Sequence, residues 1–234
     1  QPISSPGVWN QLEYRPLEGF VYAVSPFNFT AIGGNLSTAP GLMGGVSIWK
    51  PASSAMLSAY YVFKVLEAAG MPPGVINFLP GSAGMITDAL LESPQLAGIH
   101  FTGSTEVFQN MWKTVGANIA PYKSYPRLVG ETGGKDFIVA HPSANPKAVA
   151  VAIVRGGFEY QGQKCSAASR VYVPQSLWKE VRDRAIAMMK ELSMGDPRDF
   201  HNFMSAVIDK KAFDKISGYV SSAKRTAKIV QGGG

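Results

Sequence analysis

The sequence predicts an α/β fold in which a parallel sheet is wrapped by helices. Short apolar runs typical of buried strands, such as residues 20–24 and 75–79, end at proline or glycine. They alternate with segments whose apolar residues recur at helical spacing, such as residues 104–115. This alternation is the pattern of βαβ units, in which helices connect neighbouring parallel strands.

The same patterns, together with the prolines and glycines that end a helix or strand, predict the remaining elements. Residues 1–19, rich in proline and polar residues, are predicted to form an irregular arm. Ser53 or Ser54 is expected to cap a helix that ends at Gly70, since Pro72 and Pro73 prevent continuation. Further strands are expected at 46–49, 97–101, 136–140, 170–173 and 229–231, and further helices at 32–42, 83–91, 146–160, 177–192 and 210–222.

The composition fits a folded protein with one large domain or two smaller ones. Hydrophobic residues make up 46% of the 234 positions and charged residues 16%, which argues against disorder. The single cysteine excludes an internal disulfide framework and fits a reducing compartment. No apolar run approaches the roughly 20 residues of a membrane-spanning helix.

The net charge of +6 raises the possibility of nucleic-acid binding. The basic residues are dispersed, however, and the densest patch is only Lys224, Arg225 and Lys228. There is no zinc-finger spacing, aromatic RNA-binding signature or basic helix with heptads. We therefore expect no nucleic-acid partner, and a mild positive charge also suits anionic small molecules such as dinucleotides and carboxylates.

The only cysteine, Cys165, lies in a glycine-punctuated loop after a predicted helix, beside Lys164. Such a loop can expose a thiol, and a neighbouring lysine favours the nucleophilic thiolate. The alternative from local sequence is an inert cysteine buried in the core, which is the commoner fate of a free cysteine.

Several loops follow predicted strands and should meet at one rim of the sheet, where α/β proteins bind ligands. Asn28 could offer its amide to a developing oxyanion, or be an ordinary turn residue. Lys50 could meet a phosphate or a ribose hydroxyl, or be an ordinary solvated lysine.

Two further loops carry polar groups beside glycines. Gly103, Ser104 and Thr105 open a predicted helix, which makes an anion site or a simple N-cap. Glu131 lies just before two glycines, in a segment predicted to be a mobile loop whose backbone can approach a ligand closely. In such a loop it could act as a general base. No GxGxxG dinucleotide fingerprint is present.

Taken together and in this order, the motifs at Asn28, Lys50, 101–105, 131–135 and Cys165 resemble the aldehyde dehydrogenase superfamily. The resemblance covers the whole chain. It implies a Rossmann-like cofactor domain followed by part of an α/β catalytic domain. Segments 17–20, 25–35, 158–169 and 203–209 resemble the branch that oxidises L-glutamate 5-semialdehyde, formed from 1-pyrroline-5-carboxylate, to L-glutamate in proline catabolism.

The resemblance implies a catalytic role for three residues. Cys165 is expected to be the nucleophile that forms a thiohemiacetal and then a thioester with the substrate. The Asn28 amide and the Cys165 backbone N–H are expected to hold the oxyanion, and Glu131 to activate the hydrolytic water. By the same resemblance, Ser166 is expected to help hold a substrate carboxylate and Phe29 to line the aldehyde channel.

The cofactor implied by the resemblance is NAD. Lys50 is expected at the adenosine ribose, and the other cofactor-binding positions are Ser25, Ser53, Gly103, Ser104 and Thr105. Ser53 stands where many NAD-specific members carry an acidic residue, so tolerance of NADP is an open hypothesis. No metal site is expected.

The resemblance also predicts the domain organisation. Residues 1–19 are expected to be part of an oligomerisation arm, 20–133 part of the NAD-binding domain, and 134–234 the first part of the catalytic domain. Because later family motifs are absent, we expect an internal fragment that is inactive alone, from a parent that forms a homodimer or larger oligomer. The mitochondrial matrix is the expected location, or the cytoplasm of a bacterium.

Three alternatives stay open at this point. The parent could act on a different small aldehyde, and the chain itself could be a non-catalytic piece of the fold. A cysteine hydrolase is poorly supported, because His100, His141 and His201 have no family-like context with Cys165.

Overall fold

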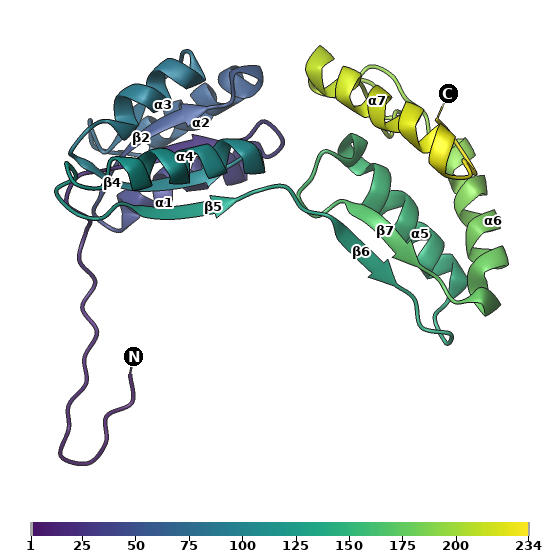
Figure 1. Cartoon of the computed structure of the whole chain (residues 1–234), viewed down its shortest axis with the longest axis horizontal. Helices are drawn as coiled ribbons and strands as arrows, with labels where there is room; N and C mark the ends of the chain where they lie inside the picture. The colour runs from purple at the N-terminus through teal and green to yellow at the C-terminus, as the bar shows by residue number, and fades with distance from the viewer. Residues whose placement is uncertain (1, 234) are drawn as a thin grey trace. The chain divides into compact units, whose positions relative to one another are not determined.

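The computed structural model describes residues 2–233, which divide into two compact units (Figure 1). The first unit ends at Thr132 and the second begins at Gly133. Each unit has its own parallel sheet and its own apolar clusters.

In the first unit, strands and helices alternate, as the sequence predicts. Their bounds are β1 Phe20–Ser25, α1 Thr30–Leu42, β2 Val46–Pro51, α2 Met56–Ala68, β3 Ile76–Phe78, α3 Ala83–Leu91, β4 Leu96–Thr102, α4 Thr105–Ala117 and β5 Arg127–Glu131. A short 3₁₀ turn, Ser53–Ala55, precedes α2.

The strands of this sheet are all parallel and lie in the order β3-β2-β1-β4-β5. The chain therefore moves outward from β1 in one direction and then returns to its other side at β4. Right-handed crossovers consequently place α1 and α2 on one face and α3 and α4 on the other. Where the strand order reverses direction in this way, between β1 and β4, a crevice opens outside the carboxyl ends of the two strands.

The first unit buries a separate apolar cluster on each face of the sheet. Tyr22 and Ile99 pack with Met111 and Val115 of α4, whereas Ala23 and Trp49 pack with Leu36 of α1. Full burial of an aliphatic or aromatic side chain of this size contributes roughly 1.5–3 kcal/mol. These two layers hold the strand ends in fixed positions.

In the second unit, a two-stranded parallel sheet packs with long helices. Its elements are β6 Asp136–Val139, α5 Pro146–Phe158, a 3₁₀ turn Glu159–Gly162, β7 Ala168–Tyr172, α6 Gln175–Glu191 and α7 Lys210–Thr226. Buried Ala150, Val154 and Ala185 join α5 to α6. Asn145 caps α5 by accepting from the backbone N–H groups of Lys147 and Ala148 at 2.9 and 3.2 Å.

Several local expectations are wrong. Residues 229–231 do not form a strand, and the helix expected at 146–160 ends at Phe158. Neither Ser53 nor Ser54 caps α2, because the chain makes a 3₁₀ turn there and the cap position of α2 is Ala55. The strand β5 was not expected, since its polar ends and Gly130 hide the apolar alternation.

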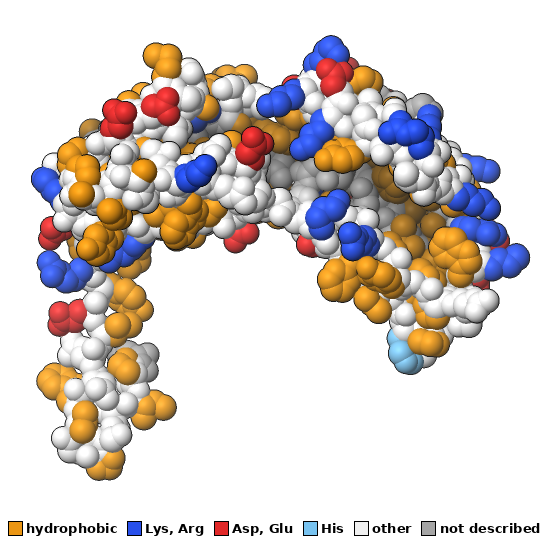
Figure 2. Space-filling model, in the orientation of Figure 1, with side chains coloured by type: hydrophobic (Ala, Val, Ile, Leu, Met, Phe, Trp, Pro, Cys, Tyr) orange, Lys and Arg blue, Asp and Glu red, His pale blue; other side chains and the backbone are white. Residues whose placement is uncertain are grey.

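The basic residues lie mostly in the second unit. Figure 2 shows Lys and Arg side chains gathered over that unit, while the first unit carries fewer of them. Within residues 2–233, no helix combines the length and apolar character that crossing a membrane requires.

Candidate active site

The carboxyl ends of the parallel strands form one rim of the first unit. Ser25 at the end of β1 is paired in register with Pro51 of β2, and Thr102 at the end of β4 is paired with Glu131 of β5. The loops that carry the predicted oxyanion donor and cofactor-binding residues leave from these ends. The sheet therefore brings these polar groups to the edge where α/β proteins bind ligands.

Ser25 is buried and joins two strands through its side chain. Its Oγ accepts a hydrogen bond of 2.8 Å from the indole Nε1 of Trp49, which is fully buried. Its backbone carbonyl accepts from the N–H of Ala52 at 3.0 Å. The hydroxyl proton of Ser25 still provides a donor, so a structural role and a ligand role are compatible.

Asn28 and Phe29 lie in the loop between β1 and α1, and both are half-buried. Phe29 occupies the N-cap position of α1 with an extended backbone, and no side chain caps this helix. The first turn of α1 also has no acidic residue. Its free N–H groups and positive dipole end therefore suit a negative charge next to the Asn28 loop.

Lys50 is not the solvated lysine that the alternative interpretation required. The residue is only 5% exposed, and burial lowers the pKa of its ammonium group. Among the described residues, no carboxylate forms an ion pair with it. A buried cation without a counter-charge is costly to the fold, and such groups concentrate at ligand sites. Ser53, by contrast, is exposed.

The N-terminus of α4 carries the next group of predicted cofactor residues. Ser104 caps the helix, its Oγ accepting from the N–H of Val107 at 3.3 Å. A Cβ on Gly103 would lie 2.7 Å from the ring of Phe101, so the backbone approaches that ring too closely for a side chain. Thr105 is exposed in the first turn, where free N–H groups can meet a phosphate.

Glu131 is the last residue of β5 and not part of a mobile loop. Its carbonyl accepts a hydrogen bond of 3.1 Å from the N–H of Gly103, which ties it to the start of α4. The residue is exposed at the rim. The hydrogen-bonded strand end therefore fixes the backbone from which the exposed carboxylate extends.

Cys165 is exposed, which excludes the buried core position. It occupies the middle of a turn with Ser166, also exposed, and the N–H of Ala167 donates to the carbonyl of Lys164 at 3.3 Å. The ammonium of Lys164 pairs with the carboxylate of Glu159 at 2.6 Å, so its charge is already engaged by a counter-charge. Hydrogen bonds from Lys164 and then Arg155 lower the pKa of Glu159.

The predicted site residues are divided between the two units. The first carries those expected to bind cofactor, hold the oxyanion and activate water, and the second carries Cys165 and Ser166. Sequence reasoning missed Gln161 and Gln163, whose side chains bind the segment at 206–208. In the sequence, the only feature that could have indicated this role was their position on either side of Gly162. In the described part of the chain, no cluster of His, Cys, Asp or Glu could hold a metal ion.

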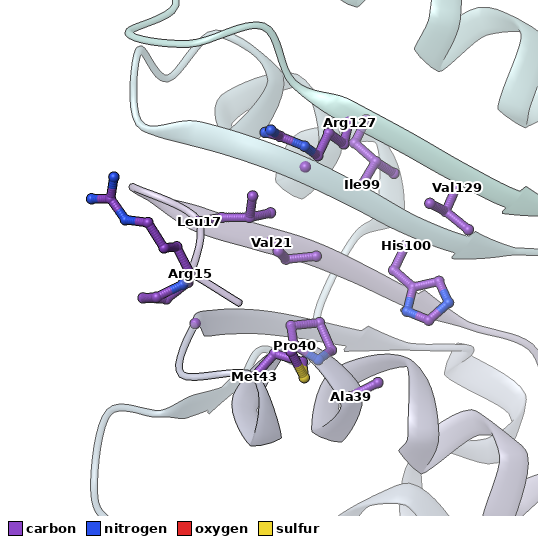
Figure 3. Close-up of a pocket in the computed structure, with 13 residues that line it drawn as sticks. Arg15, Leu17, Val21, Ala39, Pro40, Met43, Ile99, His100, Arg127 and Val129 are labelled. Atoms are coloured by element: carbon purple, nitrogen blue, oxygen red, sulfur yellow. The ribbon is translucent and has the colours of Figure 1, made fainter. Parts of the chain in front are cut away.

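A groove of about 350 Å³ in the first unit lies elsewhere (Figure 3). It runs between the arm at Arg15 and Leu17, the end of α1 and the strands β1, β4 and β5. Its lining residues come from the amino-terminal and middle parts of these strands, as Val21 and Arg127 do. None of the predicted catalytic or cofactor residues lines this groove, so it is not the reaction cleft.

Comparison with known proteins identifies the family to which this chain belongs. The model of the aldehyde dehydrogenase family matches residues 1–234, and the chain belongs to this family. It is similar to the mitochondrial delta-1-pyrroline-5-carboxylate dehydrogenase of Dictyostelium discoideum, with 52% identity over 99% of this chain and 42% of that protein. The human mitochondrial enzyme of the same name is 47% identical over 98% of this chain and 41% of its own length.

Solved structures of pyrroline-5-carboxylate dehydrogenases are also similar to this chain. Delta-pyrroline-5-carboxylate dehydrogenase from Mycobacterium tuberculosis bound with NAD has a TM-score of 0.94 and 53% identity, covering all of this chain and 44% of that one. The Thermus enzyme with bound NAD has a TM-score of 0.86 and 33% identity over 93% of this chain and 42% of its own. The α/β fold is thus that of the family, and the chain spans less than half the length of these relatives.

Proposed function

We propose that the protein containing this chain oxidises L-glutamate 5-semialdehyde, formed from 1-pyrroline-5-carboxylate, to L-glutamate with NAD in proline catabolism. The observation that carries the proposal is the exposed turn position of Cys165, the only thiol, in a chain that aligns throughout with pyrroline-5-carboxylate dehydrogenases. A buried cysteine would have excluded nucleophilic attack.

We assign the chemical steps to three residues. The Cys165 thiolate attacks the aldehyde carbon, and the resulting oxyanion accepts hydrogen bonds from the Asn28 amide and the Cys165 backbone N–H. After oxidation the acyl group is held as a thioester on Cys165. Glu131 removes a proton from the water that hydrolyses it, and its exposed place on the end of β5 supports this role.

The first unit fits a dinucleotide through its own residues. The buried Lys50 ammonium suits ribose hydroxyls, and the α4 N-terminus at Gly103, Ser104 and Thr105 suits phosphate oxygens. Ser25 provides a hydroxyl at the same rim. NAD, when bound, accepts the hydride that the aldehyde carbon must lose. Exposed Ser53 carries no charge that would repel a 2′-phosphate, so weak use of NADP is part of the proposal.

Substrate recognition is assigned to Ser166 and Phe29. The exposed Ser166 hydroxyl is next to the nucleophile and can donate to a substrate carboxylate, while the half-buried Phe29 offers an apolar wall. The many Lys and Arg residues of the second unit favour the approach of an anionic substrate.

The domain roles and cellular setting complete the proposal. Residues 20–133 serve the cofactor and 134–234 begin the catalytic domain, with 1–19 as an arm used in a homo-oligomer. A mitochondrial location is supported by the names of several eukaryotic relatives, although similar proteins also occur in bacteria.

The direct test is an activity assay of the complete gene product that contains this chain. With 1-pyrroline-5-carboxylate and NAD we expect NADH formation, which is lost in Cys165→Ala. The 234-residue chain alone is expected to form none. Activity only with an unrelated aldehyde would overturn the substrate assignment, and full activity of Cys165→Ala would overturn the mechanism.

A further inference from the structure

The loop in front of Cys165 has an unusual backbone. Tyr160 and Gln161 both have left-handed conformations, with φ of 53° and 57°, and Gly162 follows with φ of 68°. Residues with a Cβ are unfavourable in this region, because the Cβ approaches the neighbouring carbonyl oxygen. Such a conformation persists where surrounding contacts determine it, often near a functional site.

Two glutamine side chains supply contacts that determine this path. Gln161 Nε2 donates to the carbonyl of Ala206 at 2.7 Å, and the backbone N–H of Ile208 donates to Gln163 Oε1 at 2.9 Å. Both bonds lead to one segment, residues 206–208, which lies 45 positions further along the chain in each case. We call this segment the anchor segment.

Two side-chain hydrogen bonds link the loop to the anchor segment. A cavity of about 480 Å³ lies here, lined by residues of both, including Tyr160, Gln163 and Ala206. Because open space adjoins these two hydrogen bonds, we expect the loss of one of them to loosen the loop.

The anchored loop leads directly to the nucleophile. The N–H of Gln163 donates to the carbonyl of Tyr160 at 3.1 Å, and the turn that carries Cys165 begins at the next residue. Gly162 must remain glycine, since its φ is positive and an added Cβ would lie 2.9 Å from the carbonyl oxygen of Gly157. The direction of the turn is thus set from its N-terminal side.

We propose that Gln161 and Gln163 are positioning residues that hold Cys165 by tying its loop to the anchor segment. The inference rests on the proposed role of Cys165 as nucleophile. The two side chains act with opposite polarity, because Gln161 donates to a carbonyl whereas Gln163 accepts from an N–H.

Because one glutamine donates and the other accepts, replacing each by glutamate should have different effects. Gln163→Glu keeps an oxygen that can accept from Ile208, whereas it loses the longer bond of 3.4 Å from Nε2 to the carbonyl of Tyr160. Gln161→Glu instead places a carboxylate against the Ala206 carbonyl. Gln163→Met and Gln161→Met remove each bond while keeping similar volume. Gln175→Met, at an exposed position at the start of α6, is the matched control.

The variants are made in the complete gene product, and two quantities are measured. The first is hydrogen exchange of the Ile208 amide, and the second is kcat together with the KM for NAD. We expect Gln163→Met to speed exchange and lower kcat by about threefold to tenfold, the effect of losing one ordinary hydrogen bond. The KM for NAD should stay unchanged, and Gln163→Glu should keep the exchange rate of the Ile208 amide close to that of the parent.

The outcomes separate this inference from the proposed function. If both Met variants match Gln175→Met in exchange and kcat, or if Gln163→Glu speeds exchange of the Ile208 amide as much as Gln163→Met does, the positioning role is wrong. If Gln163→Met does not fold, the comparison of Gln161→Glu with Gln161→Met decides, with the carboxylate expected to be the worse. Full activity of Cys165→Ala would refute the proposed function, whatever the exchange shows.

Discussion

Gly134 lies against the backbone carbonyl of Cys165. A Cβ built on Gly134 would stand 1.9 Å from that oxygen, 3.0 Å from the carbonyl carbon and 3.1 Å from Oδ1 of Asp136. Because the nearest atoms belong to the backbone, no side-chain rotation can make room. The segment that leads into β6 is therefore in direct contact with the turn that carries the thiol, and a glycine is required where they meet.

This contact predicts that alanine substitutions at the two adjacent glycines, Gly133 and Gly134, differ clearly in their effect on stability. Gly134→Ala should destabilise the second unit by about 1–3 kcal/mol or more, because the backbone of the turn must move. Gly133→Ala is the control, since its added Cβ would meet nothing within 4 Å. Denaturant unfolding of the two variants checks this. Equal stabilities would show that the close approach does not exist in solution.

Lys50 predicts a dependence of stability on pH. Burial lowers its pKa in the folded state below the ordinary 10.5, so the unfolded chain binds the extra proton between these two values. Stability should therefore rise with pH across this window, as the folded state no longer has to bury a charge.

Replacing the lysine removes this dependence. Lys50→Met should be more stable than the parent at neutral pH, with a difference that shrinks toward pH 10.5, and should bind NAD more weakly. Unfolding measured over pH, with exposed Lys113→Met as the control, checks both parts. A loss of stability in Lys50→Met at neutral pH would contradict the account.

The bond between Ser25 and Trp49 makes a separate prediction for the first unit. Ser25→Ala leaves the fully buried indole N–H without its acceptor, which should cost about 1–3 kcal/mol. A double-mutant cycle with Trp49→Phe measures the coupling. We expect Ser25→Ala to cost much less when the indole donor is already absent, and additive effects would argue against the bond.

Asn28 is expected to act in the reaction rather than in the fold. Asn28→Ala should lower kcat by about a hundredfold to a thousandfold, the usual effect of removing one oxyanion donor. Binding of NAD, measured by titration, should change little. If the variant loses NAD binding and kcat together, the residue shapes the loop between β1 and α1 instead.

The parts of the fold that periodicity could predict are those where burial decides the structure. The central strands β1, β2 and β4 carry apolar runs, since both faces of a central parallel strand are covered. At the edge, β5 has the sequence Arg-Leu-Val-Gly-Glu, and only its pairing with β4 makes it a strand. Glu131 was consequently expected in a loop.

The site shows the same division between local and long-range causes. Ser104 could be predicted as a cap because its bond to Val107 is local. The exposure of Cys165 and the burial of Lys50 depend on packing between distant segments, so the local sequence left both open. The left-handed backbone of Tyr160 and Gln161 had no signal at all, since neither residue type favours it.

The central claim is that Cys165 carries the acyl group during turnover. The most direct measurement is peptide mass mapping of the complete gene product after acid quenching of the reaction with 1-pyrroline-5-carboxylate and NAD. We predict a glutamyl thioester on the peptide that contains Cys165, and neither adduct nor NADH in Cys165→Ala. An unmodified Cys165 peptide throughout turnover, with NADH still formed by Cys165→Ala, would contradict the claim.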